Sequence, residues 1–385
     1  MIGFREFLDS KPLYYKEIDH ERIKIAYKKL KPHLNRPKKI VHIVGTNGKG
    51  STGRIMATML RESGYSVGHY SSPHILKFNE RIWINGEDIS DTLLERYHKE
   101  LFKILGKEIS EALSYFEYTT LLSLVATQNL DVLILEAGLG GEFDATNVVD
   151  KDLSIITPID FDHQDFLGNS IKEIATTKLN SIKNMAIIGF QPHKEVERIA
   201  KSLNFDIHLL KDMVDLKEAK EILAKIEKLN WSYFLYENSL LAVNSIKLLG
   251  LEYNINSLDK VKLFGRFYPI SSNITIDVGH NSLSARACVE ALKRRYGGKK
   301  RVVLIYNSFR DKDFKSILNI FKDYIKRVEI IPIESDRAVD IEDLKEALKR
   351  AKIEFGLFKN IDNKNDYLVF GSFLVVESFI KKYLL

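Results

Sequence analysis

The chain has 385 residues and a formal net charge of +6, with 45% hydrophobic and 29% charged residues. This composition is typical of a soluble globular protein of two or three domains, and lysines interspersed with acidic residues favour small anions over nucleic acid as partners. The single Cys288 excludes an internal disulfide framework. Residues 1–17 are charged throughout and no apolar run approaches about 18 residues. We therefore expect a cytoplasmic protein without signal peptide or membrane span.

Short apolar runs alternate with longer amphipathic stretches over the first two thirds of the chain. Four runs have the composition of buried strands, at residues 38–45, 130–138, 153–160 and 185–190. Four stretches have helical periodicity, at residues 52–64, 91–105, 170–182 and 239–250. Alternating strands and helices predict a parallel sheet with crossover helices. Residues 211–236 show no clear pattern.

The alternation restarts after about residue 266. Further runs predict strands at residues 272–280, 301–308, 328–334 and 366–376. Amphipathic stretches predict helices at residues 282–297, 314–327 and 340–352. We therefore predict an α/β protein, with a parallel-sheet domain over residues 1–266 and a smaller doubly wound α/β domain over residues 267–385.

The stretch IVHIVGTNGKGST, residues 40–52, has the context of a phosphate-binding loop. It departs from the usual G-x-x-x-x-G-K-[ST] spelling, because Gly50 separates Lys49 from Ser51 and Ile43 replaces the first glycine. A glycine-rich turn between a strand and a helix can nevertheless point backbone amides at phosphate oxygens. This pattern predicts Lys49 at the outer phosphates. The alternative is a plain glycine-rich turn with an exposed lysine.

Two polar clusters follow later apolar runs. In LEAGLGGEFDATN, residues 135–147, Glu136 comes directly after a predicted strand, at the sheet edge where open α/β proteins bind ligands. A carboxylate there is suited to Mg²⁺ that bridges nucleotide phosphates. In PIDFDHQDFLG, residues 158–168, His163 is our candidate metal or phosphate contact, although helix caps and turns would also use such residues.

Taken in order, several motifs carry a resemblance to a known family: GTNGKGST, YSSPHI, NERI, FEYTTL, LEAGLGGEFDATN, DFDHQDFLG, GRF, DVGHN and GSF. The set resembles the folylpolyglutamate synthase/dihydrofolate synthase family, a branch of the Mur ligases. In that family the loop reads G-T-x-G-K followed by a small residue, so Gly50 fits its pattern. The resemblance implies a Mur ligase-like fold, with an N-terminal P-loop ATPase-type domain that binds ATP and pterin and a C-terminal glutamate ligase domain.

The resemblance also implies roles for individual residues. ATP would contact Gly45, Thr46, Asn47, Gly48, Lys49, Gly50, Ser51, Thr52, Asn238, Arg266 and Asp277. Mg²⁺, as two ions, would be held by Ser72, Glu136, His163 and a carbamylated Lys178, since a carbamate converts a cation into an anionic oxygen ligand. The pterin would contact Ser114, Tyr115, Phe116, Glu117, Phe143, Asp144 and Ala145. The catalytic set would be Lys49, His163, Lys178 and His280.

The reaction implied is ATP-dependent addition of L-glutamate to dihydropteroate and to reduced folates, through an acyl phosphate and with no enzyme nucleophile. The stretch IDHER, residues 18–22, resembles a dihydropteroate-lining segment of bifunctional members, although Asp19 could equally cap a helix. We expect a monomer with small-molecule substrates, no nucleic acid and no membrane. The alternatives are a monofunctional folylpolyglutamate synthase, a cell-wall Mur-type amino-acid ligase or an ATP-hydrolysing switch. The roughly 40 residues before the loop are too few for the UDP-binding domain usual in the cell-wall enzymes.

Overall fold

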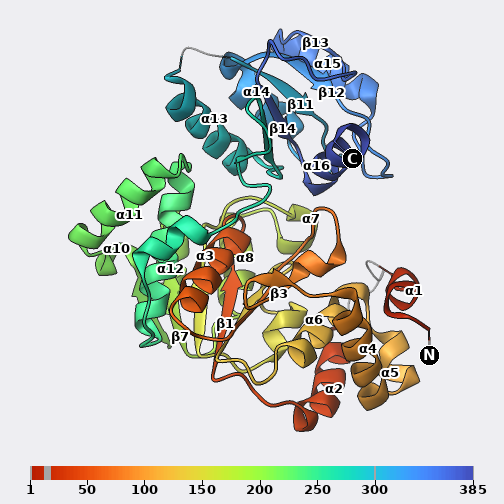
Figure 1. Cartoon of the computed structure of the whole chain (residues 1–385), viewed down its shortest axis with the longest axis vertical. Helices are drawn as coiled ribbons and strands as arrows, with labels where there is room; N and C mark the ends of the chain where they lie inside the picture. Colours follow the sequence, from red (N-terminus) through yellow and green to blue (C-terminus); the bar gives the residue numbers. More distant parts are fainter. Residues whose placement is uncertain (1, 13–18, 299–300, 385) are drawn as a thin grey trace. The chain divides into compact units, whose positions relative to one another are not determined.

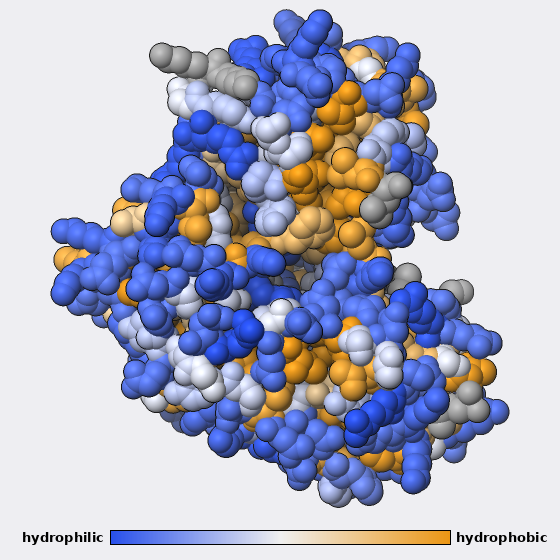
Figure 2. Space-filling view, viewed as in Figure 1, coloured by the Kyte–Doolittle hydropathy of each residue, from blue (hydrophilic) through white to orange (hydrophobic). Residues whose placement is uncertain are grey.

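The computed structural model describes residues 2–12, 19–298 and 301–384. Contacts within the chain divide it into two units (Figure 1). Unit 1 comprises Met1–Ala219 and Asn238–Val261, and unit 2 comprises Lys220–Glu237 and Lys262–Leu385. Hydrophilic side chains cover most of unit 1 on the face shown in Figure 2. Within the described residues, no helix has the length and apolar character needed to cross a membrane.

Unit 1 is built on an eight-stranded sheet in the order β4-β3-β2-β5-β1-β6-β7-β8. Its strands are β1 (Lys39–Val44), β2 (Val67–Tyr70), β3 (Ile82–Ile84), β4 (Glu87–Asp88), β5 (Val132–Glu136), β6 (Leu153–Ile156), β7 (Met185–Ile188) and β8 (Asp206–Leu209). All neighbours pair in parallel except β2 with β3 and β3 with β4. The four runs predicted as strands form β1, β5, β6 and β7, so the predicted parallel sheet is confirmed.

Helices cover both faces of this sheet. The helices of unit 1 are α1 (Phe4–Asp9), α2 (His20–Leu30), α3 (Lys49–Glu62), α4 (Asp91–Leu105), α5 (Lys107–Ala112), α6 (Tyr115–Ala126), α7 (Gln164–Leu167), α8 (Ile171–Leu179), α9 (Lys194–Ser202), α10 (Leu210–Met213) and the part of α12 (Tyr233–Leu248) that begins at Asn238. From Lys220 on, α11 (Leu216–Lys228) belongs to unit 2. On one face, α2, α4 and α6 pack in one hydrophobic cluster and α8 and α9 in another. On the opposite face lie α3, whose Gly53 meets His69 of β2, and α12, whose Leu241 meets Gly189 just after β7.

Short 3-10 turns join several of these elements: η1 (Lys31–His33), η2 (Phe78–Arg81), η3 (Ala145–Val148) and η4 (Ile255–Lys260). Residues 211–236, which gave no clear pattern in the sequence, form most of α10, all of α11 and the start of α12. α11 is amphipathic, with Ala219, Ile222 and Ile226 buried on one face among Lys and Glu residues, so the sequence did carry a helical signal there.

Unit 2 contains a six-stranded sheet in the order β13-β12-β11-β14-β10-β9. Its elements are β9 (Tyr268–Pro269), β10 (Ile274–Asp277), α13 (Ser282–Tyr296), β11 (Val302–Tyr306), α14 (Phe314–Phe321), η5 (Lys322–Tyr324), β12 (Ile325–Ile330), α15 (Ile341–Ala351), β13 (Phe355–Leu357), β14 (Tyr367–Phe370) and α16 (Phe373–Tyr383). Only β9 pairs antiparallel. The second α/β sheet predicted from the sequence is present.

Two predicted boundaries in unit 2 are wrong. The helix predicted over 314–327 ends at Phe321, and β12 already begins at Ile325. The charged residues of this stretch resemble a helix surface, but Ile325, Val328 and Ile330 are buried. The run at 366–376, predicted as one strand, contains β14 and the start of α16, because Gly371 turns the chain with φ of 139° and Ser372 caps the helix.

Candidate active site at the carboxyl edge of the first sheet

The loop between β1 and α3 lies so close to the neighbouring residues Thr157 and Asn238 that glycine is favoured at two of its positions. A Cβ atom on Gly45 would lie 2.0 Å from the hydroxyl oxygen of Thr157. Gly48 has φ of 90°, and a Cβ atom there would lie 2.8 Å from Oδ1 of Asn238. The glycines therefore do more than free the backbone, because they let the loop lie directly against the end of β6 and against α12.

The first turn of α3 holds polar groups that are buried and unused within the described chain. The hydroxyls of Ser51 and Thr52 have no hydrogen-bond partner, and neither does Nδ2 of Asn238. Buried polar groups are normally paired, and an unpaired one calls for an explanation such as a ligand. Hydroxyls and amides at a helix N-terminus match the oxygen atoms of a phosphate group.

Two lysine side chains meet at the same carbonyl group of this loop. Lys49 Nζ lies 3.1 Å from the carbonyl oxygen of Gly45, and Lys178 Nζ, from α8, lies 3.0 Å from that oxygen. Lys178 is only 4% exposed. Burial and then the charge of Lys49 lower the pKa of Lys178 to about 7, although Asp162 and Asp144 oppose the shift. The loop thus places two amines beside one carbonyl group where an anion would bind, and the pKa of one of them is lowered.

Glu136 occupies the end of β5 beside the loop. It pairs in register with Ile43 of β1, and its Oε2 atom accepts a hydrogen bond of 3.3 Å from the backbone N–H of Ser72. The structure therefore brings together two of the predicted metal ligands. His163 precedes α7 in a left-handed conformation, with its Nε2 atom 3.8 Å from Asp162 Oδ2. In the part of the chain that the structure describes, no three His, Cys, Asp or Glu side chains form a metal-binding group.

The segment at 158–168 contacts the loop through its backbone. The hydroxyl of Thr46 donates to the carbonyl oxygen of Asp160 at 3.0 Å, and the N–H of Thr46 donates to that of Pro158. Sequence reasoning missed His193, whose Nε2 atom lies 2.9 Å from Asp160 Oδ1. The only signal for it was its place after a buried strand, β7, at the same edge of the sheet.

Four predicted pterin contacts lie at the start of α6. Ser114 and Glu117 form a capping box, and Glu117 also forms an ion pair of 2.9 Å with Arg22 of α2. The ring of Phe116 packs on Gly138, where a Cβ atom would approach it to 2.7 Å. Tyr115 lies under the guanidinium of Arg81, at 5.2 Å. The two aromatic rings are only partly buried, so they can present a face to a flat ligand.

The other predicted pterin wall, residues 143–145, comes to the same region. Phe143 is 55% exposed and stacks on His20 with ring centroids 4.2 Å apart. Ala145 is buried, and Asp144 caps η3 by accepting from the N–H of Thr146. Asp19 caps α2, as its alternative interpretation required. Ile18, the first residue of the IDHER stretch, lies outside the described residues.

In unit 2, the predicted ATP contacts lie around the end of β10. The carboxylate of Asp277 accepts from the backbone N–H groups of Phe267 at 2.8 Å and Gly279 at 2.7 Å. Burial raises its pKa, against the opposing charge of Arg266 and these hydrogen bonds. Arg266 stacks over Phe373 at 5.3 Å. His280 Nδ1 lies 3.2 Å from the carbonyl oxygen of Val278.

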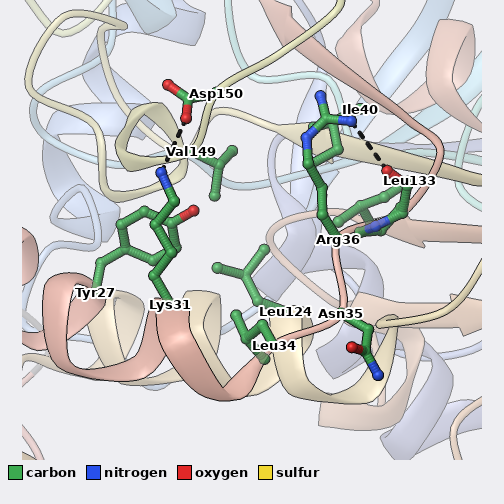
Figure 3. Close-up of a pocket in the computed structure, with 11 residues that line it drawn as sticks. Tyr27, Lys31, Leu34, Asn35, Arg36, Ile40, Leu124, Leu133, Val149 and Asp150 are labelled. Atoms are coloured by element: carbon green, nitrogen blue, oxygen red, sulfur yellow. Dashed lines mark hydrogen bonds and ion pairs between the residues drawn. The ribbon is translucent and has the colours of Figure 1, made fainter.

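A pocket of about 140 Å³ opens at the opposite edge of the first sheet (Figure 3). Tyr27 and Lys31 line one side, Arg36 lines the other, and Leu34 and Leu124 lie between them. Lys31 forms an ion pair with Asp150 at 3.1 Å. Because this pocket adjoins the amino ends of the strands, it is separate from the loop at their carboxyl ends.

An α/β unit with a glycine-rich loop, buried unpaired hydroxyls and two lysines at the carboxyl edge of its sheet defines a nucleotide-binding protein of the P-loop type. No family model matches the chain. It is, however, 32% identical over 386 residues to a protein of Buchnera aphidicola named dihydrofolate synthase/folylpolyglutamate synthase, with 93% of this chain and 91% of that protein aligned. The chain belongs to the dihydrofolate synthase/folylpolyglutamate synthase family.

Solved structures agree with this assignment. The Helicobacter pylori folylpolyglutamate synthetase matches with a TM-score of 0.79 and 36% identity over 99% of this chain and 98% of that one. The structure of E. coli FolC in complex with DHPP and ADP matches with a TM-score of 0.82, 26% identity and coverage of 99% and 97%. The bifunctional Yersinia pestis enzyme complexed with AMPPNP and Mn ion matches with a TM-score of 0.82 and 25% identity, over 100% of this chain and 98% of that one.

Proposed function

We propose that the chain is an ATP-dependent ligase that adds L-glutamate to dihydropteroate and to the glutamate tail of reduced folates. The observation that carries this proposal is the pair of buried, unpaired hydroxyls of Ser51 and Thr52 at the start of α3, next to Lys49. The names of the relatives supply the substrate class. The partly buried rings at the start of α6 supply a surface for a flat pterin.

The reaction proceeds in two steps. A carboxylate oxygen of the pteroate or folate attacks the γ-phosphorus of ATP, and ADP leaves. The glutamate amine then attacks the carbonyl carbon of the acyl phosphate, and phosphate leaves as the amide forms. The loop amides, the hydroxyls of Ser51 and Thr52 and the ammonium of Lys49 stabilise negative charge that develops on the phosphoryl oxygens. No side chain has to act as a nucleophile.

Glu136, Ser72 and His163 would hold Mg²⁺. Bound Mg²⁺ supplies charge neutralisation at the transferring phosphoryl. Lys178 would hold a second ion as a carbamate. A pKa near 7 supports this assignment, because only the neutral amine reacts with CO₂. A carbamate would also replace the repulsion between Lys178 and Lys49 by attraction.

Other side chains take part through binding. Tyr115, Phe116, Phe143 and Ala145 would contact the pterin, while Ser114, Glu117 and Asp144 hold the two walls in place. Asn238, Arg266 and Asp277 are assigned to ATP and His280 to the region of the incoming amino acid, by the family resemblance. The enzyme would act in the cytoplasm, where its single buried cysteine fits a reducing environment, and the expected monomer stays a prediction.

The test compares dihydropteroate and tetrahydrofolate side by side with ATP, Mg²⁺ and labelled L-glutamate. Glutamylation of both establishes the proposed bifunctional enzyme, and glutamylation of tetrahydrofolate alone reduces it to a folylpolyglutamate synthase. A substrate labelled with ¹⁸O in its carboxylate should transfer one ¹⁸O atom to the released phosphate, as the acyl phosphate requires. ATP hydrolysis at the same rate with and without both substrates would instead identify a nucleotide-driven switch.

A further inference from the structure

A row of buried polar side chains, which we call the relay, lies under the loop at residues 138–147. Nζ of Lys151 lies 3.2 Å from Nδ1 of His42, and Nε2 of His42 lies 2.8 Å from the hydroxyl oxygen of Thr146. That hydroxyl donates to Oδ1 of Asp144 at 2.5 Å. None of the four side chains is more than 8% exposed, and His42 and Thr146 are fully buried.

The chemistry of the groups fixes the direction of each hydrogen bond in the relay. The hydroxyl of Thr146 has one proton, and it is donated to the carboxylate of Asp144. Nε2 of His42 must therefore carry a proton to donate to Thr146. Burial and the charge of Lys151 lower the pKa of His42, so the ring is neutral and its Nδ1 accepts from Lys151. The relay thus runs from the amine of Lys151 to the carboxyl group of Asp144 with a single imidazole tautomer between them, while burial lowers the pKa of Lys151 to about 7 and raises that of Asp144.

The relay ties together three segments of unit 1. His42 belongs to β1, three residues before Gly45 of the phosphate loop. The carboxylate of Asp144 also accepts from the N–H of Leu139 at 2.9 Å, so the relay fixes the loop at both ends. Lys151 donates in addition to the side chain of Asn147 and to the carbonyl oxygen of Ser181, just after α8.

The contact with Ser181 reaches the candidate active-site lysine. The hydroxyl of Ser181 donates to the carbonyl oxygen of Lys178 at 2.6 Å. The loop itself also touches α8, because the N–H of Glu142 donates to the carbonyl oxygen of Thr177 and Gly141 lies directly against the backbone of Lys178. A shift of the loop at 138–147 would therefore change the position of Lys178.

A polar row at this place is not needed to fill the core. Hydrophobic clusters of buried side chains lie on the same face of the sheet, under α6 and under α8 and α9. Replacing a buried charged group by apolar residues is often neutral or stabilising, and the burial of Lys151 is costly enough to lower its pKa to about 7. What such a network adds is a single fixed geometry, because every donor must face its acceptor.

We propose that Lys151 and His42 are positioning residues that act through Thr146 and Asp144 on the loop at 138–147 and through Ser181 on the end of α8. They touch no substrate. They hold the wall formed by residues 143–145 in register with the strand that carries the phosphate loop. The kinetic part of this inference rests on the proposed function, whereas the hydrogen-bond order of the relay does not.

The first measurement is the ¹⁵N NMR signature of His42 in the ligand-free full chain. We expect a neutral ring protonated on Nε2, with Nδ1 accepting a hydrogen bond. In Lys151→Met the Nδ1 resonance should move toward that of a nitrogen without a hydrogen bond, with no change of tautomer. A ring protonated on Nδ1, or a spectrum unchanged in Lys151→Met, would overturn the relay regardless of what the enzyme catalyses.

The second measurement separates positioning from simple loss of stability. Thr146→Val removes the hydroxyl at constant shape, and Thr146→Ser restores it. We expect Thr146→Val and Lys151→Met to raise the KM for the pteroate substrate about tenfold, as the loss of one buried hydrogen bond would. Thr146→Ser should return it to within about twofold, and ADP affinity should stay within about twofold in all three.

A matched control is Lys172→Met, which removes an exposed lysine from α8. It should leave the KM for the pteroate substrate and the ADP affinity unchanged. An unchanged KM in Thr146→Val and Lys151→Met, or an equal loss of ADP affinity and pteroate affinity, would overturn the positioning role. If Lys151→Met does not fold, the comparison of Thr146→Val with Thr146→Ser still tests the positioning role. A wild-type enzyme inactive on every pterin would refute the proposed function and leave the NMR test intact.

Discussion

The two sheets each carry a loop that follows a buried strand and leads into a helix, yet the two loops treat their polar groups differently. After β1, the hydroxyls of Ser51 and Thr52 are buried without partners among the residues that the structure describes, and two lysines share one carbonyl group. After β10, the carboxylate of Asp277 accepts hydrogen bonds from two backbone N–H groups. The first loop keeps its hydrogen-bonding capacity for a ligand, and the second uses it to hold its own shape.

This difference has a consequence for stability. Unpaired hydroxyls and a buried ammonium near a second one destabilise the folded chain, whereas the two N–H donors at Asp277 offset part of the cost of burying its carboxylate. Residues of the first loop should therefore matter more for activity than for stability, and Asp277 should show the reverse balance. Functional sites commonly contain such locally unfavourable arrangements.

The largest expected effect is that of Lys49→Met. Removing the ammonium proposed to face the phosphoryl group should lower kcat about 10³-fold while the fold persists, since the side chain donates to the loop carbonyls of Gly45 and Thr46 and repels Lys178. Single-turnover glutamate ligation measures the effect, and thermal unfolding checks the fold. Lys172→Met is the control. Ligation within a factor of about two of wild type would show that this loop does not serve phosphoryl transfer.

Glu136→Gln should have the next largest effect. The amide keeps an oxygen for the N–H of Ser72 but removes the negative charge from the end of β5. We expect the Mg²⁺ concentration for half-maximal activity to rise about 100-fold, with little change in pterin binding. A titration of activity against Mg²⁺ measures it, with Glu108→Gln on the exposed surface of α5 as control. An unchanged Mg²⁺ curve would remove Glu136 from the metal site.

The sequence was sufficient to predict the fold class because apolar runs ending at glycine or aspartate mark buried parallel strands. β1, β5, β6 and β7 were found in this way, and so was the loop whose Gly45 and Gly48 fit closely against neighbours. Strand and helix limits were harder, as the charged stretch before β12 shows. Its exposed Lys322 and Lys326 suit the surface of a helix and the start of a strand equally well.

The arrangement of the site needed the structure. Nothing near residue 42 indicates that its imidazole meets a lysine 109 positions later, because such a contact depends on the pairing of β1 with β6. The family resemblance named Asp144 and Asp277, but only the structure shows that their oxygens accept from neighbouring backbone N–H groups. The roles assigned to individual site residues stay predictions until variants are tested.

Lys178→Met tests the contrast between the two loops through the pH dependence of stability. Because the pKa of Lys178 falls from 10.5 to about 7 on folding, the unfolded chain holds a proton between these values that the native chain has released. Stability of the wild type should therefore rise with pH across this window, by at most about 1.4 kcal/mol per pH unit. The variant lacks this contribution and should be the more stable protein at pH 7 and below, by about 1 to 3 kcal/mol.

The measurement is chemical denaturation in CO₂-depleted buffer, followed by hydrogen exchange in α8 so that unit 1 is observed by itself. The difference between wild type and Lys178→Met should shrink as the pH rises. Lys172→Met should follow the wild-type curve. If Lys178→Met is less stable than wild type at every pH, then Lys178 increases the free energy of unfolding. Its burial next to Lys49 would then not destabilise the folded chain.

The smallest expected effect, and the one that tests the second loop, is that of Asp277→Asn. The amide keeps one oxygen acceptor, but its NH₂ group must face either Phe267 N–H or Gly279 N–H, so one buried donor loses its partner. We expect unit 2 to lose about 1 to 2 kcal/mol of stability, measured by hydrogen exchange in α13, with Asp323→Asn as an exposed control. Activity should fall at least as far as the folded fraction falls, because Asp277 is also assigned to ATP. If Asp277 instead serves mainly as a nucleotide contact, ADP affinity will drop while exchange in α13 is unchanged, and the two loops would be alike in function.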